Sequence, residues 1–537
     1  MALRTYLSIL NDAAALFPQS AAFQVPDPAS GGTGSRGWRP ITYSQFANDV
    51  EEYAKYWARL LTSDGLPQKS IVGLWVGGFE YTDVLHIYGL TRAGYIPQLF
   101  PGRLPNSAVI YELMEMAGAK ALAYDPTFGP VTDCPVVTHI ARALCSDDVK
   151  GTPALPPTPV DVNAEDIVII YHTSGSTGRL PKLVRCSYRW LESMITKTAH
   201  VTKPKNTAGQ DVTVWMGSMA HSPQNFMLMG AIQHGSCTIQ PTKVPYSAEE
   251  VLDMIQMCRL NRINVYSPLL TSLLRQSKKD KEFLTALARL DEVLYTGLAL
   301  PKEDEDWAYN NGIKLTNIFG STECGALLIS IGGTGPEARL FHPIEDTAYG
   351  FFPIDSSDTA ASHTKLLELV VLSQSGDCPE PSRRSEDGHF HTGDFFEELF
   401  PGCYASRGRD DDWIKLANAV RCDTKGMEDE VRAVCGDLVS ECIIVGTGRR
   451  CPALFVETLS EMGKEDAEKI RLDIVRRMTL FNSRRYIEER IATTQLVFVV
   501  ASGSLPRTTT KGNIRRKAVE ETYREELDEA YEGLKEA

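Results

Sequence analysis

The sequence has no long apolar run and no recognisable targeting segment. None of its apolar stretches approaches the roughly 20 residues that a membrane-spanning helix needs. Residues 1–10 contain a short apolar run, but the chain turns polar at Asn11 and Asp12, which is not the form of a secretory signal. We therefore predict no membrane partner.

Paired cysteine motifs and an excess of basic residues are also missing. The 12 cysteines include no C-x-x-C pair and the 10 histidines include no H-E-x-x-H, so neither a zinc site nor a disulfide framework is indicated. This usage favours a reducing compartment, and we predict a cytoplasmic protein. The formal net charge of −14 argues against a nucleic-acid partner but allows a local basic pocket for phosphate. A chain of 537 residues is long enough for more than one domain.

The most informative stretch is 166–182. It begins with a continuous apolar run, Ile167–Ile170, which is long enough for a buried strand and too short for a helix. The run then breaks into glycines and hydroxyl residues, which permit close backbone approach and form a concave anion site. This pattern predicts a nucleotide-phosphate loop, and the alternative is a flexible surface loop. The residues are Thr173, Ser174, Gly175, Ser176, Thr177, Gly178 and Lys182.

This loop differs from that of the P-loop NTPases, which requires G-x-x-x-x-G-K-[ST], because Lys182 is followed by Leu183. Strand and helix patterns alternate before it. Ser70–Val76 and Ala121–Tyr124 are strand candidates, and Tyr81–Ala93 has the apolar spacing of a helix. Such alternation predicts α/β layers around a largely parallel sheet.

Three later stretches carry candidate ligand-binding residues. His221 follows a strand pattern and faces either a ligand crevice or, as a cap, the next helix. Phe319 offers an aromatic face for a purine, and Thr322 and Glu323 supply oxygen ligands of the kind that Mg²⁺ prefers, although a solvated turn is the alternative. Asp394 follows a glycine turn, where two carboxylate oxygens match the two hydroxyls of a ribose.

The remaining polar segments are predicted to lie at the surface. Ser373–Gly388 is polar, carries two prolines and predicts a surface excursion. Beyond Trp413 the shorter elements fit a small α+β domain. Leu505–Lys517 is a basic loop, and Val519–Leu534 is predicted to be a charged helix that forms a solvated tail or begins a linker.

In this order, the motifs resemble the adenylate-forming superfamily of acyl-CoA synthetases, non-ribosomal peptide synthetase (NRPS) adenylation domains and luciferases. The resemblance covers nearly the whole chain. Residues 84–100 and 103–106 look most like the adenylation domains of fungal NRPS-like carboxylic acid reductases. The motifs that carry the resemblance are His172–Lys182, Phe319–Glu323, Thr392–Asp394, Gly408–Lys415 and the region of Lys511.

The resemblance implies an α/β fold in two domains. A large N-terminal adenylation domain of layered sheets and helices would span residues 1–408, and a small mobile α+β lid domain would span 409–537 with its hinge at Asp411. It also implies two half-reactions. A carboxylate attacks the α-phosphorus of Mg-ATP to give an acyl-adenylate and pyrophosphate, and a phosphopantetheine thiol, on a carrier domain or coenzyme A, then takes the acyl group.

The resemblance also implies roles for single residues. Residues 173–178 and Lys182 would hold the β- and γ-phosphates, Asn317 and Phe319 would face adenine, and Gly320 and Ser321 belong to the same ATP-binding motif. Thr322 would face the α-phosphate, Glu323 the Mg²⁺, and Asp394 the ribose with Arg409 nearby. The predicted catalytic residues are Lys511, His221, Glu323 and Lys182.

Two features depart from the family pattern. The catalytic lysine usually follows the glycine of the last motif, whereas Lys511 precedes Gly512, so Arg515 or Lys517 are alternatives. Amino-acid-activating members place an aspartate close behind the position of His221, and this chain has none there. Because a buried ammonium without a partner is costly, we predict a carboxylic acid without a free α-amino group, aryl or short aliphatic. The predicted acid pocket contains His221, Phe226, Tyr266, Ser267 and Ile318.

The sequence leaves three hypotheses for the function. Neither a carrier serine motif nor a G-x-G-x-x-G fingerprint follows the last motif. The first hypothesis, the favoured one, is the first domain of a longer adenylation–carrier–reductase protein, because the charged stretch after residue 518 has the pattern of a helix that leads into a linker. A stand-alone acyl-CoA ligase is the second hypothesis. A nucleotide-binding homologue without catalysis is the third, and the intact set of Lys182, Glu323, Asp394 and Arg409 argues against it.

Overall fold

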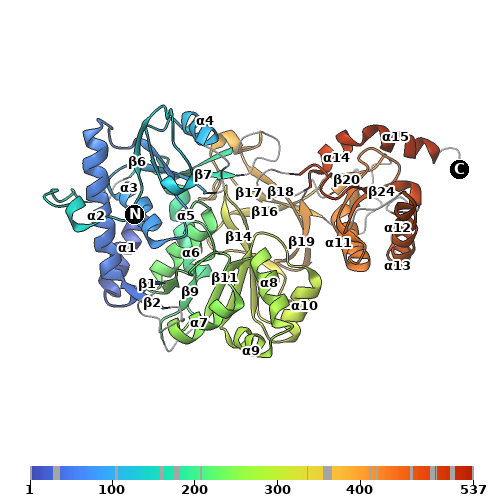
Figure 1. Cartoon of the computed structure of the whole chain (residues 1–537), viewed down its shortest axis with the longest axis horizontal. Helices are drawn as coiled ribbons and strands as arrows, with labels where there is room; N and C mark the ends of the chain where they lie inside the picture. The colour runs from blue at the N-terminus through green and yellow to red at the C-terminus, as the bar shows by residue number, and fades with distance from the viewer. Residues whose placement is uncertain are drawn as a thin grey trace. The chain divides into compact units, whose positions relative to one another are not determined.

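The structure is a computed structural model in which the chain forms two compact units. Unit 1 consists of Met1–Tyr349 with Val371–Phe390, and unit 2 consists of Gly350–Val370 with His391–Ala537 (Figure 1). The predicted domain boundary near residue 408 stays a prediction. The structure describes residues 3–27, 37–102, 104, 107–157, 162–173, 182–205, 209–335, 337–354, 366–409, 413–417, 421–459, 464–483, 490–491, 493–507 and 514–534.

Unit 1 contains a six-stranded sheet. Its strands in order are β6 (Val137–Ile140), β5 (Ala121–Tyr124), β3 (Ile71–Trp75), β4 (Ile96–Phe100), β7 (Ile167–Thr173) and β8 (Lys182–Ser187). The pairs from β6 to β7 are parallel, and β7 with β8 is antiparallel. Parallel neighbours need crossover connections, which helices supply. The predicted α/β layering around a largely parallel sheet is therefore confirmed.

Unit 1 also has a second sheet and a second series of paired strands. The second sheet has the order β2 (Trp38–Thr42), β1 (Ala21–Pro26), β10 (Cys237–Ile239) and β9 (Val212–Val214). The other series is β11 (Arg262–Tyr266), β12 (Glu292–Thr296), β13 (Leu315–Ser321), β14 (Gly325–Ser330) and β15 (Phe341–Pro343). In this series β11, β12 and β13 are parallel, whereas β13 and β14 form an antiparallel hairpin.

The helices of unit 1 begin at local sequence signals. The Thr42 hydroxyl accepts a hydrogen bond from the Gln45 N–H at the start of α2, and the Ser187 hydroxyl accepts one from the Trp190 N–H at the start of α5. The helices are α1 (Tyr6–Leu16), α2 (Tyr43–Ser63), α3 (Tyr81–Arg92), α4 (Ser107–Ala117), α5 (Tyr188–Val201), α6 (Ser222–Gln233), α7 (Ala248–Cys258), α8 (Ser267–Ser277), α9 (Lys281–Arg289) and α10 (Lys302–Asn310).

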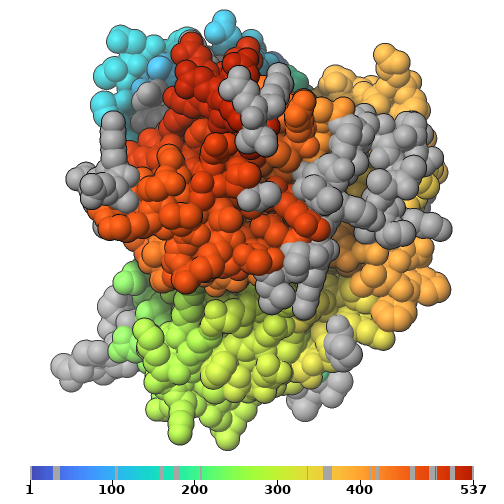
Figure 2. All heavy atoms as spheres, turned by 90° about the vertical axis from the view of Figure 1, so that its right-hand side faces the viewer, coloured from blue at the N-terminus to red at the C-terminus, as the bar shows by residue number. Residues whose placement is uncertain are grey.

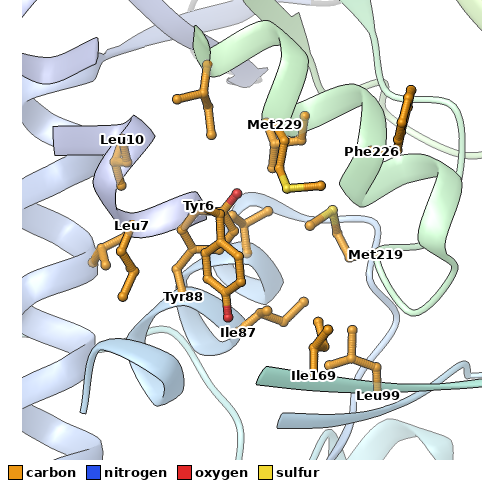
Figure 3. Packing of buried hydrophobic residues seen from close by; sticks show 14 of the residues in the cluster. Tyr6, Leu7, Leu10, Ile87, Tyr88, Leu99, Ile169, Met219, Phe226 and Met229 are labelled. Carbon is orange, nitrogen blue, oxygen red and sulfur yellow. The ribbon is translucent and has the colours of Figure 1, made fainter. Parts of the chain in front are cut away.

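The largest core cluster of unit 1 joins helices to the six-stranded sheet. Figure 3 shows side chains of α1, α3 and α6 pointing toward one another, with Leu99 of β4 and Ile169 of β7 beside them. The rings of Tyr6 and Tyr88 lie at its centre, with centroids 4.6 Å apart. Each fully buried large apolar side chain contributes about 1.5–3 kcal/mol. This packing fixes β7, which leads into the predicted phosphate loop.

Unit 2 begins with four neighbouring strands, β19 (Cys403–Arg409), β18 (Phe390–Phe400), β17 (Leu367–Val371) and β16 (Tyr349–Pro353). The pair β20 (Trp413–Lys415) and β21 (Arg421–Asp423) follows in the chain, and then the sheet β22 (Val439–Val445), β23 (Ala453–Thr458) and β24 (Val497–Val500). The helices of unit 2 are α11 (Thr424–Cys435), α12 (Lys464–Arg477), α13 (Thr479–Ser483), α14 (Arg516–Thr522) and α15 (Arg524–Gly533).

The end of the chain differs from its prediction. The expected single helix Val519–Leu534 is two helices, α14 and α15 (Figure 1), whose atoms are among the dark red spheres of Figure 2. Val519, Leu527 and Tyr531 are buried and pack with Phe455 of β23. The prediction of a solvated tail is wrong for these residues, because the apolar residues recur every four positions among the charges and form one buried stripe. Within the described part of the chain, every helix lacks the length or the apolar character needed to cross a bilayer.

Candidate functional site

The base of the predicted phosphate loop is a pair of antiparallel strands. Thr173, the last residue of β7, is paired with Lys182, the first residue of β8. Ser174, Gly175, Ser176, Thr177 and Gly178 lie outside the described residues. The Lys182 side chain is exposed. The hairpin therefore presents this lysine at the point where the loop returns to the sheet.

His172, one residue before Thr173, is buried near the end of β7. Its ring stacks on Phe100 with centroids 4.8 Å apart. Burial lowers the pKa of His172 to about 4, so the ring is neutral at pH 7. Its Nδ1 lies 2.9 Å from the Leu99 carbonyl oxygen and its Nε2 lies 3.1 Å from the Gln98 side-chain nitrogen. In the neutral tautomer that fits both contacts, Nδ1 donates and Nε2 accepts. His172 thus braces the strand that leads into the loop.

The Phe319–Glu323 motif forms the end of β13 and the turn into β14. Ser321 is paired with Gly325, and the Ser321 hydroxyl accepts a hydrogen bond from the Cys324 N–H at 3.2 Å. A Cβ at Gly320 would lie 2.2 Å from the Gly325 carbonyl oxygen, so only glycine fits this close approach. The chain turns here between β13 and β14, and Thr322 and Glu323 stand at the tip of this turn. Asn317 lies earlier on β13, where its backbone N–H donates to the Ser330 hydroxyl at 2.8 Å.

Helix α5 holds the backbone of this turn. The Trp190 indole N–H donates to the carbonyl of Glu323 at 2.9 Å. The Lys197 ammonium donates to the carbonyls of Cys324 at 2.8 Å and Ala326 at 2.6 Å. Gly325 has φ of +67°, and a Cβ there would lie 2.2 Å from the Met194 sulfur. The turn is therefore fixed by close packing and by hydrogen bonds.

Lys197 is paired with Asp377 in the interior of unit 1. Both side chains are 0% exposed, and Nζ lies 2.7 Å from Oδ2. The hydroxyl groups of Tyr349 and Ser375 also donate to this carboxylate. A buried ion pair persists when further hydrogen bonds satisfy its members, as they do here. The motif search missed both residues. A lysine on the apolar face of α5, at helical spacing from Trp190 and Met194, was the available signal.

The segment 373–388 is therefore only in part the surface excursion that its polar composition predicts, since residues 381–382 and 385–387 are exposed. Ser375, Asp377 and Cys378 are buried in unit 1. The polar composition suggested a solvent-exposed segment, because the buried partner of Asp377, Lys197, lies 180 residues away in the chain.

A second side chain of this segment joins the two predicted ATP motifs of unit 1. Arg383 lies in the short 3₁₀ helix Pro381–Arg383. Its guanidinium donates to the carbonyl of Leu183, the residue after Lys182. Its Nη1 lies 3.8 Å from Oε1 of Glu323. One guanidinium group thus contacts β8, the strand of the predicted phosphate lysine, and also lies beside Glu323, the predicted metal ligand.

The donor set at Glu323 fits Mg²⁺. No cluster of three or more His, Cys, Asp or Glu side chains suited to a metal occurs among the described residues. Mg²⁺ is usually held by one or two carboxylates together with substrate phosphates and water, rather than by a protein cage. Glu323 is 19% exposed, so its carboxylate is within reach of a ligand. The Glu323 carboxylate together with the phosphates of a nucleoside triphosphate is such a set of oxygen ligands.

The predicted acid-pocket residues come from four elements of unit 1. His221 is the N-cap residue of α6 and makes no side-chain cap hydrogen bond, so the capping alternative is not supported. Phe226 and Ile318 are buried in the main core cluster. A Cβ at Gly217 would lie 2.6 Å from the Tyr266 ring, so this ring covers the loop before His221. The Ser267 hydroxyl donates to the carbonyls of Thr296 and Leu298 and holds the end of β12.

The predicted ribose ligand lies in unit 2. Asp394 of β18 is paired with Arg409 of β19, and Nη1 of Arg409 lies 3.0 Å from Oδ1 of Asp394. The Thr392 hydroxyl accepts from the Asp394 N–H at 3.0 Å and donates to the Leu369 carbonyl at 2.7 Å. The glycine turn before the aspartate is therefore locked by its own threonine. The predicted hinge, Asp411, lies outside the described residues.

Lys511 also lies outside the described residues, but the chain on either side of it is anchored. Arg507 and Ile514 form an antiparallel bridge. The two Nη atoms of Arg507 bind the two carboxylate oxygens of Glu457 at 3.0 and 2.7 Å, and the Leu505 N–H adds a bond of 2.9 Å. Such a bidentate pair gives directional as well as electrostatic stabilisation. The described residues on the two sides of this segment therefore form a fixed stem.

The strength of this stem is expected to depend on pH. Burial raises the pKa of Glu457, but the bonds from Arg507 and Leu505, with the Arg507 charge, outweigh burial and lower it. A lowered folded-state pKa gives stability that is present above the unfolded-state value, about 4.3, and is lost as pH falls through the folded-state value. Urea unfolding of the wild type and of Glu457→Gln should differ at pH 7 and converge below about pH 4.3. A difference that does not change with pH would contradict this assignment.

Comparison with known proteins agrees with these motifs. The family described as AMP-binding enzyme matches residues 10–346, and the AMP-binding enzyme C-terminal domain matches 411–535. The AMP-binding domain-containing enzyme iboA of Amanita muscaria is 36% identical, over 88% of this chain and 92% of that protein. The adenylate-forming reductase stbB of Stachybotrys bisbyi is 24% identical, over 84% of this chain and 42% of that protein.

A solved structure shows the same fold. It is the o-succinylbenzoate CoA synthetase of Bacillus subtilis with its acyl-adenylate intermediate, which superposes with a TM-score of 0.72 over 96% of this chain and 98% of that one, at 14% identity. The chain thus spans nearly all of iboA but less than half of stbB. The predicted fold and superfamily are confirmed, and the chain belongs to the AMP-binding enzyme family as an adenylate-forming enzyme.

Proposed function

We propose that this enzyme activates a carboxylic acid with ATP, giving an acyl-adenylate and pyrophosphate, and then transfers the acyl group to a phosphopantetheine thiol. The observation that carries the proposal is the meeting of two distant motifs at Arg383. Leu183 on one side follows the predicted phosphate lysine, and Glu323 on the other is the predicted metal ligand. The guanidinium thus places the strand of the predicted phosphate lysine beside the predicted metal ligand, which supports one shared nucleotide site.

The proposed roles follow from charge and reach. Lys182, exposed at the start of β8, binds a terminal phosphate, and Thr322 donates to the α-phosphate. Glu323 holds Mg²⁺, which supplies neutralisation of phosphate charge when bound. Asp394 accepts the two ribose hydroxyls, and Phe319 with Asn317 contacts adenine. Lys511 places its ammonium between the attacking carboxylate and the α-phosphate. Phosphoryl transfer depends chiefly on such positioning and electrostatic stabilisation.

We further propose that the acid lacks a free α-amino group. The polar side chains behind His221 are neutral and already serve the backbone. The Gln224 side-chain oxygen accepts from the Met216 N–H at 2.8 Å, and the Asn225 amide donates to the Met219 carbonyl at 2.5 Å. An ammonium group buried here would find no carboxylate on these two residues, and burying an ammonium without a carboxylate partner is costly. An aryl or short aliphatic acid, held beside Phe226, Tyr266 and Ile318, avoids this cost.

This substrate class can be tested by pyrophosphate exchange. The full chain is incubated with ATP, Mg²⁺, labelled pyrophosphate and one acid at a time, from aryl, short aliphatic, 2-oxo and amino-acid series. Exchange should rise clearly above the acid-free background with aryl or short aliphatic acids, because pyrophosphate is incorporated into ATP only by reversal of acyl-adenylate formation. Exchange with amino acids alone would contradict the substrate proposal. Exchange with none of the acids would favour the non-catalytic alternative.

The acceptor is proposed to be a phosphopantetheine arm on a carrier domain, as the matches to adenylate-forming reductases suggest. The match to nearly the whole of iboA supports the alternative of free coenzyme A or a separate carrier. The two are distinguished by supplying the acid found above with either coenzyme A or a phosphopantetheinylated carrier and measuring thioester. The 12 cysteines, all in the described part of the chain, form no disulfide, which supports work in a reducing compartment such as the cytoplasm.

A further inference from the structure

Arg383 has more hydrogen-bonding capacity than its protein contacts use. A guanidinium has five N–H donors in a planar fork. The Leu183 carbonyl takes one of them. The neighbouring carboxylates, Glu323 at 3.8 Å from Nη1 and Glu380 at 3.6 Å from Nε, lie beyond ordinary hydrogen-bond distance. Nε is buried and has no hydrogen-bond partner among the described residues.

Contacts within unit 1 hold Arg383 in its position. Its side chain is 19% exposed and donates to the backbone of β8 at Leu183. Asp377, six residues earlier in the same segment, is tied to Lys197 in the core. The segment that carries Arg383 is therefore anchored to the helix that holds the Glu323 turn.

We propose that Arg383 is a phosphate-binding residue of this site. In the nucleotide-free enzyme its guanidinium neutralises Glu323. When Glu323 carries Mg²⁺ and a triphosphate is bound, the same guanidinium donates to oxygens of the β- or γ-phosphate. A guanidinium can bind a phosphate through two parallel hydrogen bonds. It makes no such bonds to Glu323 or Glu380, so its donors are available for a phosphate. The ligand class is a nucleoside triphosphate or pyrophosphate, and the inference rests on the proposed function.

The test uses the full chain and two neighbouring arginines. Arg383→Gln removes the charge, and Arg383→Lys keeps it without the fork. Arg384→Gln is the matched control, because Arg384 is adjacent and its Nε donates to the Pro379 carbonyl instead. Binding of Mg·ATP, Mg·pyrophosphate and AMP is measured by isothermal titration calorimetry at fixed ionic strength, with circular dichroism and thermal unfolding to check the fold.

Arg383→Gln is expected to weaken binding of Mg·ATP and Mg·pyrophosphate by about 10- to 100-fold, as expected for a lost hydrogen bond to a charged group. AMP, which lacks the β- and γ-phosphates, should bind within about 3-fold of the wild type. The Mg·ATP affinity of Arg383→Lys should lie between those of Arg383→Gln and the wild type. Arg384→Gln should bind Mg·ATP as the wild type does. These results would support a direct phosphate contact, since a merely structural role would weaken AMP as much as ATP.

Two outcomes would overturn the inference. One is Mg·ATP binding by Arg383→Gln equal to that of the wild type, and the other is an equal loss of AMP and ATP affinity. The proposed function fails separately, if the wild type itself binds no Mg·ATP or shows no acid-dependent pyrophosphate exchange.

Discussion

Replacing Lys511 with alanine is expected to lower acid-dependent pyrophosphate exchange by about 10²- to 10³-fold, the loss typical of removing one preorganised charge-stabilising donor. In the proposed reaction the ammonium stabilises negative charge that builds up between the attacking carboxylate and the α-phosphate. It contributes most in the transition state, so Mg·ATP binding should change by less than about 10-fold. Exchange rates at saturating ATP and calorimetric Kd values measure the two effects separately.

The controls are two further cations of the same basic stretch, Arg515 and Lys517. Arg515 is the N-cap residue of α14, and its N–H donates to the Pro506 carbonyl at 2.8 Å. Lys517 lies in the first turn of that helix. Arg515→Ala and Lys517→Ala should keep most of the exchange activity. Full activity of Lys511→Ala, with the loss appearing in one of these variants, would move the catalytic role to that residue.

Replacing Lys197 with methionine is expected to lower the free energy of unfolding by about 3–5 kcal/mol, because it leaves the buried carboxylate of Asp377 without its cation. The same change removes the donor to the carbonyls of Cys324 and Ala326, so the turn that carries Glu323 loses its support. Exchange activity should therefore fall as well. Urea unfolding followed by tryptophan fluorescence gives the stability, and exchange is assayed where the variant is folded.

A double variant separates stability from positioning. Lys197→Met with Asp377→Leu removes both charges and should recover most of the lost stability, because apolar residues of similar volume often replace a buried pair without cost. Exchange activity should stay low, since the two carbonyls still lack their donor. Recovery of both properties would contradict the positioning role.

An exposed ion pair is the control for the stability effect. Lys69→Met breaks an exposed pair with Asp166 and should change stability by less than about 1 kcal/mol.

Local patterns predicted the elements that a short stretch of chain specifies. The apolar run Ile167–Ile170 is strand β7, the helix expected from Tyr81 is α3, and the glycine motif at 320–325 is the tip of a hairpin. Each depends on spacing or on a backbone conformation that neighbouring residues enforce. The superfamily also followed from sequence, because its motifs are contiguous and occur in a set order.

Polar composition was a poor guide where burial depends on distant partners. Segment 373–388 appeared solvated, yet its Asp377 is enclosed with Lys197. The charged stretch 519–534 appeared to be a free tail, yet its apolar stripe packs on the sheet of β22, β23 and β24. In both cases a few buried side chains among many charges decide the outcome, and average composition does not register them.

The sequence by itself determined the fold class, the family and the residues whose chemistry suits ATP, because these are written in contiguous motifs. Only the tertiary structure decided what supports them. It showed α5 holding the Glu323 turn through Trp190 and Lys197, and Arg383 joining Leu183 to Glu323. The physical reason is that a hydrogen bond depends on distance in space, and these partners lie 60 to 200 positions apart in the chain.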